Sequence, residues 1–208
     1  MKLLVSGSTA SVRKWLPKSG GKLGVLLTPA NGNSVESILK LDCDWAADNG
    51  CFGGLDEQAF LGMLDAIQGK PRLQWVTCPD VVAWSRFTRQ LFEEWAPELE
   101  SRALPIAYVL QDGETISGVP WDRITAVFVG GSTKFKIGHD AKALVCEAKQ
   151  RGKLVHMGRV NSESRLLLAK SWGCDSVDGT SMSCFGETYI PKFLGVAKSP
   201  ERQRSLIS

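Results

Sequence analysis

The chain has 208 residues, of which 43% are hydrophobic and 23% charged, a composition that excludes disorder of the whole chain. The net charge of +3 is too small to identify a nucleic-acid partner, although it permits a local basic face. No stretch reaches the roughly 18 apolar residues of a membrane span, and the six cysteines form no Cys-x-x-Cys pair. We therefore expect one cytoplasmic domain over residues 1–208, with reduced thiols, no metal and no membrane contact, ending in a polar tail at 198–208.

Short apolar runs alternate with longer polar segments along the chain. Helical spacing is present in segments 55–68, 81–100, 140–151 and 162–172, the last with Asn161 as a candidate N-cap. The connections after the first, second and fifth runs are poorer helix candidates. Several runs are continuously apolar, as in parallel strands buried on both faces. Eight such strands predict a compact (β/α)8 barrel, with a doubly wound open sheet as the alternative. The predicted strands are residues 2–5, 23–28, 44–48, 73–77, 105–110, 126–129, 153–157 and 175–178.

Polar or glycine residues follow six consecutive predicted strands. The strand ends of a barrel and the loops after them build its active site, so these residues are expected to converge on one rim. The alternative is that Asp, Asn and Gly at strand ends are ordinary turn residues, which holds well for any single position and poorly for six in a row. The segments concerned begin at Asp48, Cys78, Gln111, Gly130, His156 and Asp178.

These residue types suit the cleavage of a nucleoside bond. Two carboxylates beside a glycosidic carbon can act as nucleophile and general acid/base. An Asp and a Gln can read the polar edge of a purine, because Asp accepts hydrogen bonds while Gln donates and accepts. Phe52 and Met157 can enclose a flat ring, and Gly130 and Gly131 let a ligand approach the backbone closely.

The order of these residues resembles the tRNA-guanine transglycosylase superfamily, (β/α)8 barrels that exchange guanine in a polynucleotide for a 7-deazaguanine. Residues 48–52 are similar to the family motif Asp-Ser-Gly-Gly-Phe/Tyr, with Asn49 and Cys51 as departures. The resemblance implies that Asp178 is a nucleophile forming a covalent glycosyl intermediate and that Asp48 is a general acid/base. It implies no cofactor. The substrate-binding residues that it implies are Phe52, Asp80, Gln111, Gly130, Gly131, Met157 and Gly158.

One departure concerns the end of the chain. The family's tRNA enzymes continue into a zinc-binding region with three Cys and one His, whereas the 30 residues after Asp178 contain Cys184 as their one Cys and no His. The chain is therefore most similar to the DNA-guanine transglycosylases of phages and bacterial DNA-modification systems. This resemblance implies DNA and a free 7-deazaguanine, such as 7-cyano-7-deazaguanine, as partners in a bacterial or phage-infected cell, and it leaves the oligomeric state open.

Three other functions remain open at this point: a minimal tRNA-guanine transglycosylase, a nucleoside hydrolase-like barrel, and a barrel that only binds a 7-deazapurine or nucleic acid. Lys134, Lys136 and Arg159 follow the sixth and seventh strands and are candidate phosphate contacts, with a solvated charged loop as the equal alternative. His156 has a catalytic position, although a hydrogen-bonded barrel histidine is the favoured interpretation.

Overall fold

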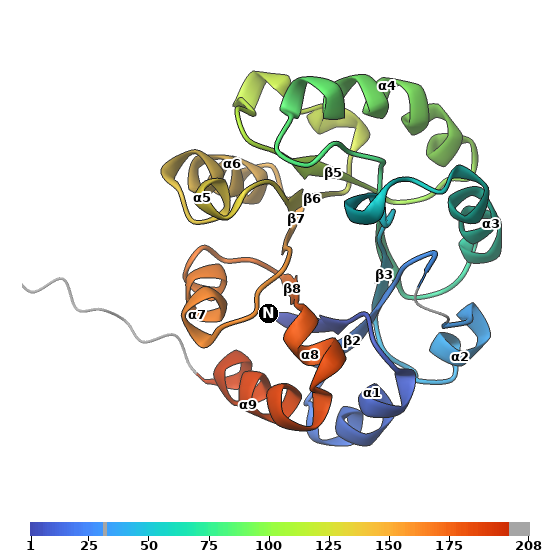
Figure 1. The fold of residues 1–208 in the computed structure, drawn as a ribbon, viewed down its shortest axis with the longest axis vertical. Helices are drawn as coiled ribbons and strands as arrows, with labels where there is room; N and C mark the ends of the chain where they lie inside the picture. The colour runs from blue at the N-terminus through green and yellow to red at the C-terminus, as the bar shows by residue number, and fades with distance from the viewer. Residues whose placement is uncertain (31–32, 200–208) are drawn as a thin grey trace, which may run out of the picture.

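A computed structural model describes residues 1–30 and 33–199 of the chain, except for the side chain of Phe52. Eight parallel strands form a closed barrel in the order β1 to β8, and helices surround it (Figure 1). The open-sheet alternative is therefore wrong. The expected tail falls mostly on residues 200–208, which lie outside the described part. The strands are β1 (Lys2–Val5), β2 (Leu23–Leu27), β3 (Trp45–Ala47), β4 (Leu73–Thr77), β5 (Ile106–Leu110), β6 (Ala126–Val129), β7 (Leu154–Met157) and β8 (Ser176–Asp178).

The four expected helices are present, although their ends differ from the predicted ones. They are α3 (Glu57–Ile67), α4 (Ser85–Ser101), α6 (His139–Gln150) and α7 (Glu163–Ser171). Ser162, rather than Asn161, caps α7 by accepting a hydrogen bond from the Arg165 N–H group. The Asn161 side chain instead accepts from the Ser181 N–H group, and so ties the loop after β7 to the short helix that follows β8, α8 (Thr180–Cys184).

The poorly predicted connections hold short elements. The first holds α1 (Thr9–Trp15) and the 3-10 turn η1 (Leu16–Lys18), the second holds α2 (Val35–Leu39), and the fifth holds two 3-10 turns, η3 (Ile116–Gly118) and η4 (Trp121–Arg123). Further short elements lie at the mouth of the barrel. These are η2 (Cys51–Gly53), α5 (Thr133–Lys136) and α8 (Thr180–Cys184).

The helix α9 (Gly186–Lys198) is an addition to the predicted elements, and it packs against β1, α1, α7 and α8. Ile190, Phe193, Leu194 and Ala197 are buried on one side of it. Their spacing is the helical one, so the sequence does carry a signal for this element. Among the described residues, no helix combines the length and apolarity that crossing a membrane requires.

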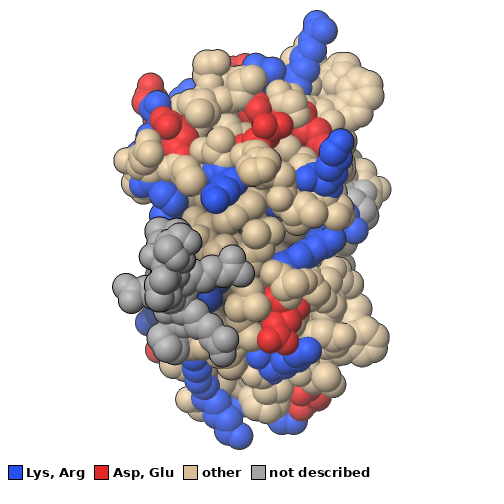
Figure 2. Space-filling model, turned by 90° about the vertical axis from the view of Figure 1, so that its left-hand side faces the viewer, with Lys and Arg blue, Asp and Glu red and all other residues tan. Residues whose placement is uncertain are grey.

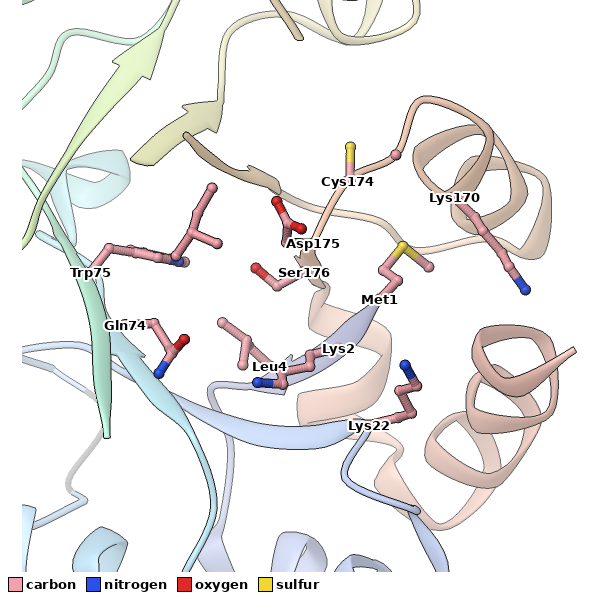
Figure 3. Close-up of a pocket in the computed structure, with 12 residues that line it drawn as sticks. Met1, Lys2, Leu4, Lys22, Gln74, Trp75, Lys170, Cys174, Asp175 and Ser176 are labelled. Atoms are coloured by element: carbon pink, nitrogen blue, oxygen red, sulfur yellow. The ribbon is translucent and has the colours of Figure 1, made fainter. Parts of the chain in front are cut away.

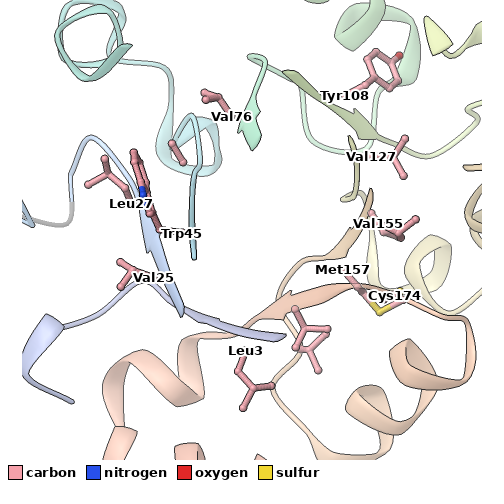
Figure 4. Close-up of a cluster of buried hydrophobic side chains, with 14 of the residues drawn as sticks. Leu3, Val25, Leu27, Trp45, Val76, Tyr108, Val127, Val155, Met157 and Cys174 are labelled. Atoms are coloured by element: carbon pink, nitrogen blue, oxygen red, sulfur yellow. The ribbon is translucent and has the colours of Figure 1, made fainter. Parts of the chain in front are cut away.

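The core has two layers because successive strand side chains point to opposite faces. Inward-facing side chains fill the barrel. A larger outward-facing set, part of which is drawn in Figure 4, packs beneath the helices. The inner layer includes Leu4, Leu26 and Trp75, whereas Leu3, Trp45 and many others belong to the outer layer. This alternation decides which residues near the strand ends can reach the mouth.

Candidate functional site at the C-terminal mouth of the barrel

A cavity of about 110 Å³ lies at the C-terminal ends of the strands. The inward-facing positions that end or follow the strands supply its polar lining. The structure brings together there the predicted residues Asp48, Asp80, Gln111, Gly130, Gly131, Lys136, Arg159 and Asp178. Four residues that were not predicted as site residues, Asn49, Val82, Val109 and Phe128, also line it. Val109 and Phe128 lie two positions before Gln111 and Gly130, on the same face of their strands, and this spacing could have identified them as lining residues.

Asp178 ends β8 and is held in place from β7. The imidazole of His156, which is fully buried, bridges the Ser176 hydroxyl (Nδ1 to Oγ, 2.9 Å) and the Asp178 carboxylate (Nε2 to Oδ1, 3.1 Å). The Arg159 N–H group donates to the same carboxylate oxygen at 3.0 Å. The interpretation of His156 as a hydrogen-bonded barrel histidine is therefore confirmed. Its two bonds also orient the Asp178 side chain.

Asp48 follows β3 and lies in a different environment. The hydroxyl of Thr77 donates to Asp48 Oδ1 at 2.9 Å, and the Asn49 N–H group donates to that hydroxyl at 2.7 Å. Burial raises the pKa of the Asp48 carboxyl, and the nearby charge of Asp178 raises it further, while the Thr77 hydrogen bond lowers it. Asp48 therefore holds a proton more readily than an exposed carboxyl does.

Asp80 is the centre of a side-chain network between two strands. Asn49 Nδ2 donates to Asp80 Oδ1 at 2.8 Å, and Gln111 Nε2 donates to Asp80 Oδ2 at 2.6 Å. Burial nevertheless raises the pKa of Asp80 to about 6. The carbonyl oxygen of the Gln111 amide accepts from the Ala83 N–H group at 2.8 Å, and Gln111 is only 1% exposed. One donor and one acceptor position of the Gln111 amide hold Asp80 and its loop, and the residue also lines the cavity, so its expected role in reading a ligand stays a prediction.

Met157 does not reach the mouth. It is 2% exposed and packs in the outer layer beneath the helices, where Figure 4 shows it beside Cys174. The expected stacking of Met157 on a ligand is wrong, since alternation in β7 points His156 inward and Met157 outward. Phe128, from β6, occupies the mouth instead. Phe52 lies in η2, and its side chain is outside the described structure.

The predicted glycines are packed closely against neighbouring parts of the chain. Gly131 has a φ of +73°, and a Cβ there would lie 2.6 Å from an Asp112 carboxylate oxygen. The Gly130 N–H group is bonded to the Leu110 carbonyl oxygen and is therefore not free for a ligand, although Gly130 lines the cavity and the expected close approach of a ligand to its backbone stays a prediction. A Cβ on Gly158 would lie 2.5 Å from the Phe128 ring, so Gly158 supports the mouth without lining it.

The three predicted phosphate contacts are in different environments. Lys134 is exposed, whereas Arg159 is exposed and also lines the mouth. Lys136 is only 7% exposed, so the expectation of a surface phosphate contact is corrected for this residue. Burial lowers its pKa to about 8, and the positive charge of Arg159 acts in the same direction. On the face drawn in Figure 2, basic and acidic side chains are interspersed, without one continuous basic stripe.

A second cavity, of about 430 Å³, lies at the opposite end of the barrel (Figure 3). Lys2, Lys22, Trp75 and Asp175 are among its lining residues. Lys2 forms an ion pair with Asp44. Active sites of (β/α)8 barrels lie at the C-terminal face, so the smaller cavity is the candidate site. No three His, Cys, Asp or Glu side chains within the described ranges form an arrangement that could hold a metal ion.

Among known proteins, similarity to this chain was found at the level of three-dimensional structure only. No known protein-family model matches the sequence, and no curated protein matches it. Solved structures of mandelate oxidase do match. A variant with benzaldehyde has a TM-score of 0.60 and a variant with a C4a-OH-FMN adduct has one of 0.62. Both are 13% identical to this chain, and each alignment covers 93% of this chain and 70% of the oxidase.

This comparison confirms the barrel fold and contradicts the expected activity. The matched structures are of an oxidase, and one of them carries an FMN adduct, so the expected DNA-guanine transglycosylase function and glycosyltransferase class are corrected. At 13% identity the similarity establishes the fold alone. The tRNA-guanine transglycosylase resemblance itself stays a prediction.

The mouth of this chain does not fit FMN. Barrels of this type frequently bind phosphate with the loops after the seventh and eighth strands. Here the Asp178 carboxylate accepts a hydrogen bond from the Arg159 N–H group. A Cβ on Gly179 would lie 2.3 Å from the Val160 carbonyl oxygen, so the loops after β7 and β8 are already in contact. The cavity of about 110 Å³ is also below the roughly 300 Å³ at which sites for larger organic ligands begin.

Proposed function

We propose that the protein is an enzyme that transfers protons to and from a small polar molecule bound at the C-terminal mouth. One observation carries this proposal: the carboxyls of Asp48 and Asp178 line the same small cavity in different environments. Pairs of titratable groups in contrasting environments are the usual arrangement for an acid and a base. The cavity has room for a small ring or a short-chain metabolite.

The two carboxyls have distinct roles in this proposal. Burial raises the pKa of Asp48, and we therefore assign to it the role of holding and donating a proton. Asp178 accepts a hydrogen bond from the Arg159 N–H group and pairs with His156, so it is fixed as the acceptor. Asp80, Asn49 and Gln111 support the rim between β3 and β5, and Phe128 supplies an apolar wall.

Exchange of hydrogen with solvent tests the proposal even though the substrate is unidentified. The protein is incubated in D2O with a panel of small hydroxy, keto and amino compounds, and loss of ¹H signal from the compound is followed by NMR. We expect exchange with at least one compound, and a fall of about 10²–10⁴-fold for Asp48→Asn and for Asp178→Asn. Asp122→Asn, which removes an exposed carboxyl, is the matched control. Exchange that persists in both active-site variants, or that no compound shows, would overturn the proposal.

The partners expected from the sequence stay predictions. DNA, tRNA as its alternative, and a free 7-deazaguanine base are tested by adding each to the protein and following binding by fluorescence anisotropy or ligand NMR. Lys134 and Arg159 are the exposed candidates for phosphate contacts. Binding through them weakens as salt increases, and it weakens further in a Lys134→Gln, Arg159→Gln variant. The cytoplasmic location also stays a prediction.

A further inference from the structure

The short helix α5 places one lysine over the mouth. Asp112 anchors the start of the helix, since its carboxylate accepts from the Ser132 N–H group at 2.7 Å and from the Ser132 hydroxyl at 2.5 Å. The Ser132 hydroxyl in turn accepts from the Phe135 N–H group at 3.2 Å, which caps α5. Lys136 is the last residue of this helix, and its side chain lines the mouth cavity.

The Lys136 side chain is largely buried and lines the mouth cavity in the described structure. It is 7% exposed, and its amine makes no hydrogen bond or ion pair with any residue within 1–30 or 33–199. The amine nitrogen itself is not among the fully buried polar atoms of the described residues, so it is the stem of the side chain that is covered. The neighbouring Lys134 on the same helix is exposed. The side chain of Lys136 lines the same cavity as Asp48 and Asp178, so its amine is placed to act on whatever occupies the mouth.

We propose that Lys136 is a catalytic lysine that forms an imine, and that the mouth takes a small aldehyde or ketone. This inference rests on the proposed function, for which it names the substrate class. The Lys136 nitrogen forms a bond to the carbonyl carbon, giving a carbinolamine. The carbonyl oxygen then leaves as water, carrying the two hydrogens that the amine gives up. Asp48 protonates the departing hydroxyl and regains its proton from the nitrogen, so no oxidant or reductant is consumed.

The surroundings of Lys136 favour its neutral, nucleophilic form. Lysine becomes a nucleophile when it is desolvated or placed beside another cation, and both conditions hold here. Burial is the largest effect, and the charges of Arg159 and Arg165 also lower the pKa of Lys136. The charges of Asp178 and Asp112 raise it. With a pKa of about 8, roughly a quarter of the amine is neutral at pH 7.5. The corresponding fraction for an ordinary lysine is about 0.1%. The imine of a small carbonyl compound also makes the adjacent C–H bond more acidic, which suits the proton transfer proposed for Asp48 and Asp178.

Reductive trapping tests this inference on the full chain. The protein is incubated with glycolaldehyde, acetaldehyde or pyruvate and sodium cyanoborohydride at pH 5–9, and peptides are mapped by mass spectrometry. We expect a secondary amine at Lys136 with at least one probe, formed at least tenfold faster than at Lys134. Its formation should increase with pH through a midpoint near 8. Lys136→Met keeps the side-chain volume and should lose this adduct, whereas Lys134→Met, the matched control on the same helix, should retain it.

Two results would overturn the inference: labelling spread evenly over exposed lysines, or no labelling of Lys136 by any probe. In either case Lys136 would serve as a positive charge alone. Because the map is made on the unmodified protein, it does not depend on the folding of the Lys136→Met variant. Trapping and solvent exchange are measured separately. Exchange that depends on Asp48 and Asp178 without trapping removes this inference alone, whereas trapping without exchange removes the proposed proton transfer alone.

Discussion

The raised pKa of Asp80 predicts how the stability of the protein depends on pH. The folded state raises this pKa to about 6 from its ordinary value of 3.8, first through burial and then through the charge of Asp48. The folded state therefore binds a proton more tightly than the unfolded chain, so stability decreases as the pH increases between these two values. A rise of the pKa from 3.8 to about 6 corresponds to a penalty of about 3 kcal/mol at pH 7.5, and to roughly half of that at pH 5.

The substitution Asp80→Asn removes this titration. The amide that it introduces also places an N–H donor against the side-chain amide of Asn49 or Gln111, each of which donates at this contact. The loss of one hydrogen bond lowers stability by the same amount at pH 7.5 and at pH 5. The test is therefore the change between pH 7.5 and pH 5, measured by urea unfolding. We expect the wild-type protein to gain about 1–2 kcal/mol relative to Asp80→Asn as the pH falls over this range. Asp122→Asn, at an exposed carboxyl, should follow the wild type. Parallel pH profiles for the wild type and Asp80→Asn would refute the reasoning.

Three further substitutions separate the structural residues from the site. Met157→Ala should lower the free energy of unfolding, measured in urea, by about 2–5 kcal/mol, because it leaves a cavity in the outer layer of the core. Ligand binding at the mouth should be unchanged. Weakened binding would contradict the placement of Met157 in the outer layer. Gly131→Ala should lower the free energy of unfolding by more than about 1 kcal/mol, because Gly131 has a φ of +73° and an Asp112 oxygen lies close to it. The control Gly62→Ala, within α3, should be neutral or stabilising. Equal shifts in melting temperature for the two variants would contradict this explanation of Gly131. Tyr108→Phe removes the 2.6 Å hydrogen bond to buried Glu114 and should cost about 1–3 kcal/mol by thermal unfolding; an unchanged melting temperature would be inconsistent with that bond.

The barrel could be predicted because its signal is local. Runs such as β2, in which every residue is buried, are continuously apolar, and this is the pattern of a strand covered on both faces. The helices α3 and α4 carry apolar residues at helical spacing over many turns. Elements of four or five residues, such as α5 and α8, have too few positions to establish a period, and they depend on caps and tertiary contacts.

The convergence of Asp48, Asp80 and Asp178 was also predictable. It follows from one rule, that the strand ends of a barrel meet at one face. The roles of the residues around these carboxylates were harder to predict from the sequence. Gln111 has the chemistry to read a ligand, but which of its hydrogen bonds are already used depends on the Ala83 loop and on Asp80, which are distant in sequence. Similarity of motif order was likewise insufficient to establish the activity.

Residue type and short-range spacing are enough to predict the number and order of the strands and the set of polar residues at their ends. Which of those side chains reach the mouth depends on tertiary packing, because each strand must present one face to the barrel interior and the other to the helices. A shift of one position along β7 exchanges His156 for Met157, and so replaces a polar support of Asp178 by an outer-layer core residue. The burial of Lys136 has the same origin, because it depends on how Asp112 and Ser132 orient α5 over the barrel.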